Sequence, residues 1–415
     1  MVYQNIIYNN EGLLGRFLHI TDIHLDPYYL ESSDPTSFCH RYSRNQVLNI
    51  AGKFGILSAP CDSPYHLTNS TFEFIRSNFS DVDFIVYTGD SVRHDKDSKV
   101  FKRTEDQVLD IHKRVVENIQ NYLNLSKIKF IPTLGNNDEF EHNRLPEGPN
   151  DLLSNLTKIW APLNLNLTSD FLKGGYYRQD IHSKLSVLSL NSMYFYKKNK
   201  LVSDCNITDS PGASQLEWLE RELKNARGER RKIYISQHVP PLDESNEESY
   251  FPACFYAYIQ LLGKYSDVIC GHFTGHTDQD MLSFVTSTSK SENAYSIFLL
   301  DEPPISNTIS AEDIVLVLTN APSIKPTHNP AVRLYEYSTS VWDFGALKDY
   351  TQYFVNLTEA NKIRVARWEI EYIASETYGM NSLKTKDWTR VLNKFKIPDS
   401  DVWRSYVKHI TVSGP

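Results

Sequence analysis

Five short apolar segments of this chain each end in a cluster of polar residues that are able to bind metals. The segments are RFLHI, DFIVY, KIKFIPTL, KIYIS and DVIC, which are rich in the β-branched and aromatic residues that favour strands. Helical periodicity separates several of them, as in residues 104–125 and 213–226. Alternating strands and helices build layered α/β cores, whose functional groups collect at the carboxyl ends of the strands. The pattern therefore predicts one α/β core with a single site at those ends.

The length of 415 residues allows a large catalytic core with an additional part. Residues 1–14 lack the basic start and apolar stretch of a signal peptide, and we interpret them as the remnant of a stem. Residues 15–330 are expected to form the catalytic domain. A strand followed by a Trp- and Tyr-rich, largely helical tail predicts a C-terminal subdomain, residues 331–415, packed on the core.

The polar residues at the strand ends form a set of candidate metal ligands. Asp22 and His24 lie two positions apart in an extended segment and so share one face. Asp90 follows a glycine that permits close approach, and its carboxylate is suited to bridging two cations. A lone Asp-x-His is more often a loop aspartate and a packed histidine, but five motifs in order favour a two-metal centre for phosphoryl chemistry. The complete set is Asp22, His24, Asp90, Asn136, His238 and His276.

A basic stretch, RHDKDSKVFKR, follows Asp90. On composition alone it is a solvated loop with interspersed acids. Its position beside the bridging aspartate also makes Arg93 and Lys96 candidates for holding the flanking phosphates of a long chain, with His142 as a weaker candidate. The formal charge of −8 argues against a general reader of nucleic acids, but not against a polyanionic substrate.

Two features favour an oxidising, secretory compartment. Five cysteines lie far apart at positions 39, 61, 205, 254 and 270, which allows two disulfides and one free thiol, and Cys270 in the apolar run DVIC is the best candidate for a buried free one. Five reduced cysteines in a cytosolic protein remain the alternative.

No stretch of about 18 apolar residues occurs, so attachment to a membrane is expected only through an anchor ahead of this sequence. Seven glycosylation sequons begin at Asn69, Asn78, Asn124, Asn155, Asn166, Asn206 and Asn356.

The ordered set D-x-H, GD, GN, H and GH resembles the calcineurin-like metallophosphoesterase superfamily. The stretches GRFLHITDIHLDPYY, CDSP, TGDSVRHD, PTLGNND, HVPP and NPAVRLYEY are most similar to the endopolyphosphatase family, in the branch that also holds acid sphingomyelinase-like phosphodiesterases. The resemblance implies an α/β, four-layer sandwich of two central mixed β-sheets flanked by helices, with a C-terminal helical subdomain. It also implies two divalent metal ions, whose identity stays open among Zn, Mn, Mg, Fe and Co.

By this resemblance, Asp22 and His24 bind one metal, Asp90 bridges, and three residues bind the second, namely Asn136, His238 and His276. The implied disulfides are Cys39–Cys61 and Cys205–Cys254. His272 has no ligand counterpart in the family, so we interpret it as a structural histidine.

Two departures from the superfamily pattern affect the predicted chemistry. Asn137 stands at the position of the usual catalytic histidine and is kept as a candidate catalytic residue, while the role of the acid is assigned to His94. Asp278 replaces a histidine ligand, and a carboxylate there would still bind the first metal while favouring Mn or Mg.

The leading hypothesis is an endopolyphosphatase that cleaves inorganic polyphosphate internally by a metal-bound hydroxide, with His94 protonating the leaving phosphate. The expected location is a vacuole lumen, or a secreted or lysosome-like compartment. The first alternative is an acid-sphingomyelinase-like phosphodiesterase that acts on phospholipid head groups or nucleotides. The second is a binding protein that has lost catalysis through Asn137 and Asp278.

Overall fold

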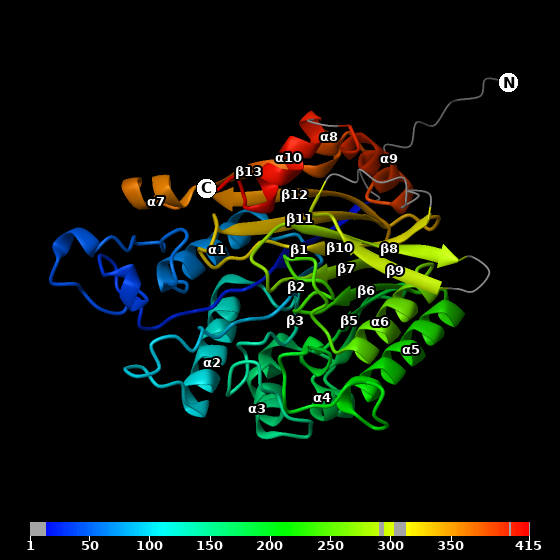
Figure 1. Cartoon of the computed structure of the whole chain (residues 1–415), viewed down its shortest axis with the longest axis horizontal. Coiled ribbons are helices and arrows are strands. Elements are labelled where there is room, and N and C mark those ends of the chain that lie inside the picture. The colour runs from blue at the N-terminus through cyan, green and yellow to red at the C-terminus, as the bar shows by residue number, and fades with distance from the viewer. Residues whose placement is uncertain (1–13, 290–293, 303–312, 398–399, 415) are drawn as a thin grey trace.

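The computed structural model describes residues 14–289, 294–302, 313–397 and 400–414 (Figure 1). The predicted stem therefore lies outside the described residues, apart from Leu14. The strands are β1 (Leu14–Ile20), β2 (Phe84–Tyr87), β3 (Lys129–Pro132), β4 (Tyr177–His182), β5 (Leu185–Ser189), β6 (Lys232–Ser236), β7 (Ile269–Thr274), β8 (Met281–Ser289), β9 (Ala294–Leu299), β10 (Ile314–Asn320), β11 (Ala331–Ser338), β12 (Leu347–Val355) and β13 (Trp368–Ile373). The helices are α1 (Tyr65–Asn78), α2 (Glu105–Tyr122), α3 (Asp151–Ile159), α4 (Ser169–Gly174), α5 (Pro211–Glu229), α6 (Pro252–Lys264), α7 (Leu357–Ile363), α8 (Ala374–Tyr378), α9 (Thr385–Phe395) and α10 (Asp401–Ile410). Short 3-10 helices are η2 (Pro35–Ser37), η3 (Gln46–Leu48), η4 (Ala161–Leu163) and η5 (Ser192–Tyr194).

The strands form two mixed sheets. The first has six strands in the order β13-β12-β11-β1-β2-β3, and the second has seven in the order β4-β5-β6-β7-β10-β8-β9. Strands β1, β2 and β3 run parallel, as do β5, β6, β7 and β10. Each parallel set therefore delivers its carboxyl ends to one edge, where the polar clusters of the sequence follow.

An aromatic cluster joins the two sheets. Phe17 of β1 lies with its ring centroid 5.4 Å from those of both Tyr234 and Phe273, which belong to β6 and β7 of the other sheet. Tyr335 of β11 stacks on Phe17 at 5.0 Å. These rings are fully buried, so the apolar faces of both sheets share one core that fixes the relative position of their loops.

Helices cover the outer faces, with α2 to α6 below the sheets and α8 to α10 above them in the view of Figure 1. The predicted helical segments 104–125 and 213–226 correspond to α2 and α5. Thr104 caps α2 by accepting from the backbone N–H of Gln107, and α5 starts with Pro211 after a Ser210 cap. The predicted sandwich of two mixed sheets flanked by helices, with helices near the C-terminus, is confirmed.

The C-terminal part differs from its predicted description in one respect. Besides the predicted strand β11, it contributes β12 and β13, which extend the first sheet beyond β1. The division at residue 330 stays a prediction. Among the described residues, no helix is long and apolar enough to cross a membrane.

Both implied disulfides are present, Cys39–Cys61 and Cys205–Cys254, and Cys270 is free. Cys270 is the free thiol, as predicted, but it is half-buried rather than buried. Burial raises the pKa of its thiol to about 11, so it is not a reactive thiolate at neutral pH. Six of the seven sequon asparagines are exposed and Asn155 is half-buried, and their glycosylation stays a prediction.

Candidate metal centre

The loops after β1, β2, β3, β6 and β7 meet at one end of the two sheets. They bring together all six side chains that the sequence analysis selected as ligands. Five of them are buried, and His276 is partly exposed at the rim. The set comprises Asp22, His24, Asp90, Asn136, His238 and His276.

One group of ligand atoms lies around His24. Its Nε2 is 3.4 Å from Oδ1 of Asp22 and 3.3 Å from Oδ2 of Asp90. The Nδ1 of His24 lies 3.0 Å from the carbonyl oxygen of Val92, to which it donates a hydrogen bond. This bond leaves the lone pair of Nε2 free for a metal. Oδ1 of Asp22 is buried without a hydrogen-bond partner, as expected for an oxygen that faces a cation.

A second group lies around Asn136. Its Oδ1 is 2.9 Å from Nε2 of His238 and 2.8 Å from Nδ1 of His276. Nδ1 of His238 lies 2.8 Å from the carbonyl of Thr88 and donates to it, so Nε2 carries the free lone pair. The amide nitrogen of Asn136 donates to Nε2 of His142 at 2.9 Å, which directs the amide oxygen into the group.

Asp90 belongs to both groups. Its Oδ2 lies 3.3 Å from Nε2 of His24 and 3.3 Å from Nε2 of His238. Burial alone would raise the pKa of Asp90, but the two neighbouring imidazoles outweigh burial and hold the pKa well below its usual range. An ionised carboxylate between two sets of nitrogen and oxygen atoms fits a bridge between two divalent cations.

Two glycines of the motifs are required because the backbone passes close to the ligands. A Cβ at Gly135 would lie 2.1 Å from Oδ1 of Asp90. A Cβ at Gly275 would lie 2.0 Å from Oγ1 of Thr21 and 2.6 Å from Oδ2 of Asp22. The GN and GH motifs therefore provide space for a ligand that comes from a different loop.

Asp138 organises the loop that carries Asp90, a role that the sequence analysis missed. Its Oδ2 accepts from the backbone N–H of Asp90 at 2.9 Å and of Gly135 at 2.8 Å. Its Oδ1 accepts from the N–H of Ser91 at 2.7 Å. The sequence signal for this role was Asp138 as the last residue of the GNND motif. An acid that is buried beside a metal ligand needs hydrogen-bond donors such as these backbone N–H groups.

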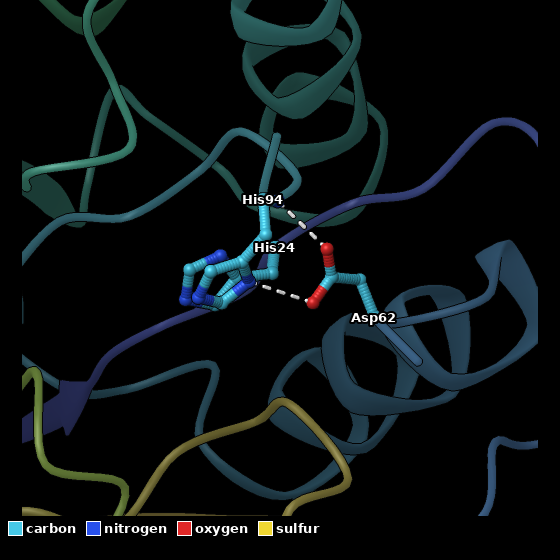
Figure 2. A group of neighbouring side chains, drawn as sticks. All are labelled: His24, Asp62 and His94. Carbon is cyan, nitrogen blue, oxygen red and sulfur yellow. Dashed lines mark hydrogen bonds and ion pairs between the residues drawn. The ribbon is translucent and has the colours of Figure 1, made fainter. Parts of the chain in front are cut away.

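His94 lies against His24, with ring centroids 4.2 Å apart and planes inclined by 15° (Figure 2). Its Nδ1 is 2.8 Å from Oδ1 of Asp62, and its backbone N–H donates to Oδ2 of the same carboxylate at 2.7 Å. Because Nδ1 is engaged by Asp62, Nε2 is the ring nitrogen of His94 that remains available to the cavity that this residue lines. Burial lowers the pKa of His94 to about 4, although Asp62 opposes that shift. Asp62 was also missed, and the CDSP stretch around it was the only signal.

The structure places Asn137 as a partner of Asp90. Its backbone N–H donates to Oδ1 of Asp90 at 2.7 Å and its Nδ2 donates to Oδ2 at 2.8 Å. Oδ1 of Asn137 has no hydrogen-bond partner and the residue lines the cavity. Asn137 therefore holds the bridging carboxylate, and its predicted catalytic role stays a prediction.

Two of the predicted substrate residues do not face the cavity. The guanidinium of Arg93 is buried and donates to the carbonyl of Phe101 at 2.9 Å and to Oε1 of Gln107 at 2.8 Å, so it supports its own loop. Nζ of Lys96 donates to the carbonyl of Pro60 at 3.2 Å. His142 does line the cavity, and so does Lys198, which the sequence analysis did not select.

Asp278 lines the cavity but is held by a buried lysine. Its Oδ2 accepts from Nζ of Lys325 and from Oγ1 of Thr327, both at 2.8 Å. Burial would raise the pKa of Asp278, but Lys325 outweighs it and holds the pKa far below the usual range. Oδ1 has no partner. Its role as a metal ligand stays a prediction.

His272 lies away from both groups, on β7. It is buried, and its Nε2 is 2.7 Å from the hydroxyl of Tyr258. This arrangement agrees with its interpretation as a structural histidine.

The cavity above the two groups has a volume of about 190 Å³. All the side chains that line it are polar or charged, and the only aromatic ring outside the histidines belongs to Tyr196. Its lining comprises His24, Asp90, His94, Asn136, Asn137, His142, Asn143, Tyr196, Lys198, His276 and Asp278.

Two facing sheets with a buried carboxylate shared by two histidine-containing groups define a metallophosphoesterase, a class of hydrolases that depend on divalent metal ions. The calcineurin-like phosphoesterase family model matches residues 15–277, and the acid sphingomyelin phosphodiesterase C-terminal region matches residues 304–414. The chain belongs to the calcineurin-like phosphoesterase family, in the branch that carries this C-terminal region.

Its relatives include two kinds of enzyme. The cyclic GMP-AMP phosphodiesterase SMPDL3A of Homo sapiens is 32% identical over 411 residues, which cover 98% of this chain and 84% of that protein. The endopolyphosphatase of Debaryomyces hansenii is 38% identical over 290 residues, covering 66% of this chain and 39% of that protein. The endopolyphosphatase of Saccharomyces cerevisiae is 36% identical over 280 residues, or 65% of this chain and 41% of that protein. The chain thus spans about two fifths of the length of these two endopolyphosphatases.

Among solved structures, a dimetal phosphatase from Danio rerio has a TM-score of 0.43 and 13% sequence identity, covering 81% of this chain and 95% of that one.

Proposed function

We propose that this chain is a metal-dependent endopolyphosphatase that cleaves inorganic polyphosphate internally. The observation that carries the proposal is the predominantly polar and charged lining of the cavity beside the metal centre, in which Tyr196 supplies the one non-histidine ring. A polyphosphate chain offers only charged oxygens, whereas a lipid head group or a nucleoside also offers an apolar surface that such a lining does not match. The identity of 38% to an endopolyphosphatase over two thirds of the chain supports the same choice.

The residues have distinct roles in this proposal. Asp22 and His24 would hold one metal ion, Asn136 and His238 the other, with His276 beside the second and Asp90 between the two. When bound, such ions activate water and neutralise charge on phosphoryl oxygens. Their identity among Zn, Mn, Mg, Fe and Co is not decided by this donor set.

Proton transfer to the leaving phosphate is assigned to Nε2 of His94. Asp62 fixes the ring by binding Nδ1, so that Nε2 is the nitrogen that reaches the cavity. Burial lowers the pKa of His94 to about 4, so acid favours the protonated ring that can donate to the leaving group. Lys198 at the cavity wall would bind a flanking phosphate.

A phosphodiesterase that acts on nucleotides is the second candidate. Two observations favour it: the ring of Tyr196 lies at the cavity, where it could stack on a base, and the SMPDL3A proteins match almost the whole chain.

One comparison of substrates tests both candidates. The protein with added Mn²⁺, Zn²⁺ or Co²⁺ is incubated with long-chain polyphosphate, sphingomyelin, a nucleoside triphosphate and a cyclic dinucleotide, and the products are resolved by length. Polyphosphate fragments of intermediate length are expected. Orthophosphate alone would show cleavage from the ends, and phosphocholine or nucleoside monophosphate as the sole product would reject the proposal. Asp90→Asn is the inactive control.

A further inference from the structure

The disulfide Cys39–Cys61 closes a loop, here called the 39–61 loop, whose base is rigid. Both cysteines pack with Ala51 in a small buried cluster. The backbone of Ala51 is tied on both sides, because its carbonyl accepts from the N–H of Ser32 at 2.7 Å and its N–H donates to the carbonyl of Ser33 at 3.1 Å. The disulfide and these bonds fix the position from which the remainder of the loop projects.

The outer part of the loop is also held by its own hydrogen bonds. The backbone N–H of Ser43 donates to Oδ1 of Asn49 at 2.7 Å, and Nδ2 of Asn49 donates to the carbonyl of Ser43 at 3.1 Å. Asn45 caps η3 by accepting from the N–H of Val47. On the other side the loop rests on α7, since Asn361 binds the backbone of both Phe54 and Gly55.

This ordered loop exposes four large apolar side chains, here called the apolar tip. Val47 is 79% exposed, Tyr42 and Ile50 are each 62% exposed, and Leu48 is 43% exposed. In Figure 1 the segment is blue and projects beyond the sheets on the side of α7. Single exposed apolar residues are common, but four within nine positions of one ordered loop are typical of a contact surface.

The charge of the loop indicates the kind of surface that it contacts. Residues 39–61 contain Arg41, Arg44 and Lys53 and no acidic residue, in a chain whose formal charge is −8. Arg41 pairs with Asp97. Neither Arg44 nor Lys53 has a carboxylate partner within 4.0 Å in the described part of the chain; Nζ of Lys53 donates to the carbonyl of Arg364 and lies over the ring of Phe54. The loop is therefore a locally cationic projection on an anionic protein.

We propose that the 39–61 loop docks this protein on an anionic lipid bilayer, with the apolar tip in the interface and Arg44 at the head groups. A convex projection with apolar side chains enters a deformable interface, whereas a protein partner would need a matching hollow. Asp62 follows Cys61 directly and binds His94, so the base of the docking loop is joined to the candidate site. The inference concerns binding and does not depend on which phosphoester is cleaved.

Sedimentation with vesicles tests the proposal. The full chain is mixed with vesicles of phosphatidylcholine alone or with 30% phosphatidylserine, and the bound fraction is measured against lipid concentration. Binding should require phosphatidylserine and weaken in 0.5 M NaCl. Val47→Ser with Ile50→Ser should weaken binding at least about tenfold, and Arg44→Glu should remove the preference for anionic vesicles.

The matched control is Val341→Ser with Trp342→Ser, since these residues are 86% and 93% exposed on the turn between β11 and β12. This pair should leave binding unchanged, and all variants should keep the thermal midpoint of the wild type. Absence of wild-type binding, equal binding to both vesicles, or loss of binding only in the control pair would each overturn the proposal. Self-association that disappears in the loop variant, measured by analytical ultracentrifugation, would assign the tip to a second copy instead.

Discussion

Asp62 binds His94 through both of its carboxylate oxygens, with Oδ1 2.8 Å from Nδ1 of the ring and Oδ2 accepting the backbone N–H at 2.7 Å. These two bonds fix the rotation and the tautomer of the His94 ring. One face of the ring stacks on the candidate ligand His24. The catalytic acid of the proposed reaction thus depends on a carboxylate that lies 32 positions away in the chain.

Asp62→Asn should impair catalysis without removing metal. The amide retains the volume but loses one acceptor and the charge, so kcat should fall by about 10- to 100-fold at unchanged metal content. Asp62 also raises the pKa of His94 against the effect of burial, so in the variant the alkaline limb of the pH profile, where the acid loses its proton, should move to lower pH. Asp97→Asn, which faces Nδ1 of His40 at 3.1 Å, is the control that should leave both quantities near the wild type. Wild-type kcat in Asp62→Asn would remove His94 from the proton-transfer role.

Gly135→Ala should disturb the metal centre. Its Cβ would lie 2.1 Å from Oδ1 of Asp90, so the carboxylate must move. The expected cost is about 1–3 kcal/mol of unfolding free energy, together with a metal affinity at least about tenfold weaker. Gly228→Ala is the matched control, because no atom lies within 4 Å of the added methyl group at that position in α5. Equal metal affinity in the two variants would show that the close approach is not needed.

Asp278 and Lys325 should behave as one buried ion pair. Lys325→Met leaves the carboxylate of Asp278 without its 2.8 Å partner, which should cost about 3–5 kcal/mol of unfolding free energy. The double variant with Asp278→Asn should recover most of this loss. Urea unfolding of the two single variants and the double variant gives the coupling energy. Additive effects would indicate that Asp278 serves another partner, such as a metal ion.

His272 should make the fold sensitive to acid. Burial lowers its pKa from 6.5 to about 3, so the folded state disfavours protonation and the unfolded state takes up the proton first. Stability is therefore lost as pH falls below 6.5, by about 1.4 kcal/mol per pH unit for this residue. His272→Gln should reduce the loss between pH 6.5 and 5 by roughly 2 kcal/mol, measured by urea unfolding at each pH with pH 8 as reference. An unchanged loss would mean that His272 does not contribute.

Much of the architecture could be predicted because local patterns carry it. The runs that become β1, β2, β3, β6 and β7 are short, apolar and bounded by polar residues, and each ligand follows its strand directly. Strands β12 and β13 were missed. In β12, LKDYTQYFV, apolar and polar residues do not alternate regularly, whereas β13, WEIEYI, does alternate and could have been predicted by the same rule.

Contacts between distant loops could not be predicted in the same way. The stretch after Asp90 contains cations whose position beside that residue suggested phosphate binding, yet buried Arg93 serves backbone carbonyls of its own loop. Asp138 and Asp62 are ordinary acids in the sequence, and only the folded backbone shows which N–H groups they accept from. The two-residue spacing of Asp22 and His24 did indicate their proximity, with Nε2 of His24 3.4 Å from Oδ1 of Asp22. The extended backbone expected for this segment was wrong, because both residues have positive φ, 52° and 42°.

Metal content is the sharpest test of the proposed centre, because every assigned role depends on Asp90 as a bridge between two cations. The wild type and Asp90→Asn are each saturated with Mn²⁺ or Zn²⁺, freed of excess, and measured by inductively coupled plasma mass spectrometry beside hydrolysis of polyphosphate. We expect about two equivalents in the wild type, and fewer in the variant together with loss of hydrolysis. A wild type that holds at most one equivalent while active, or an Asp90→Asn variant that keeps both ions and full activity, would contradict this expectation.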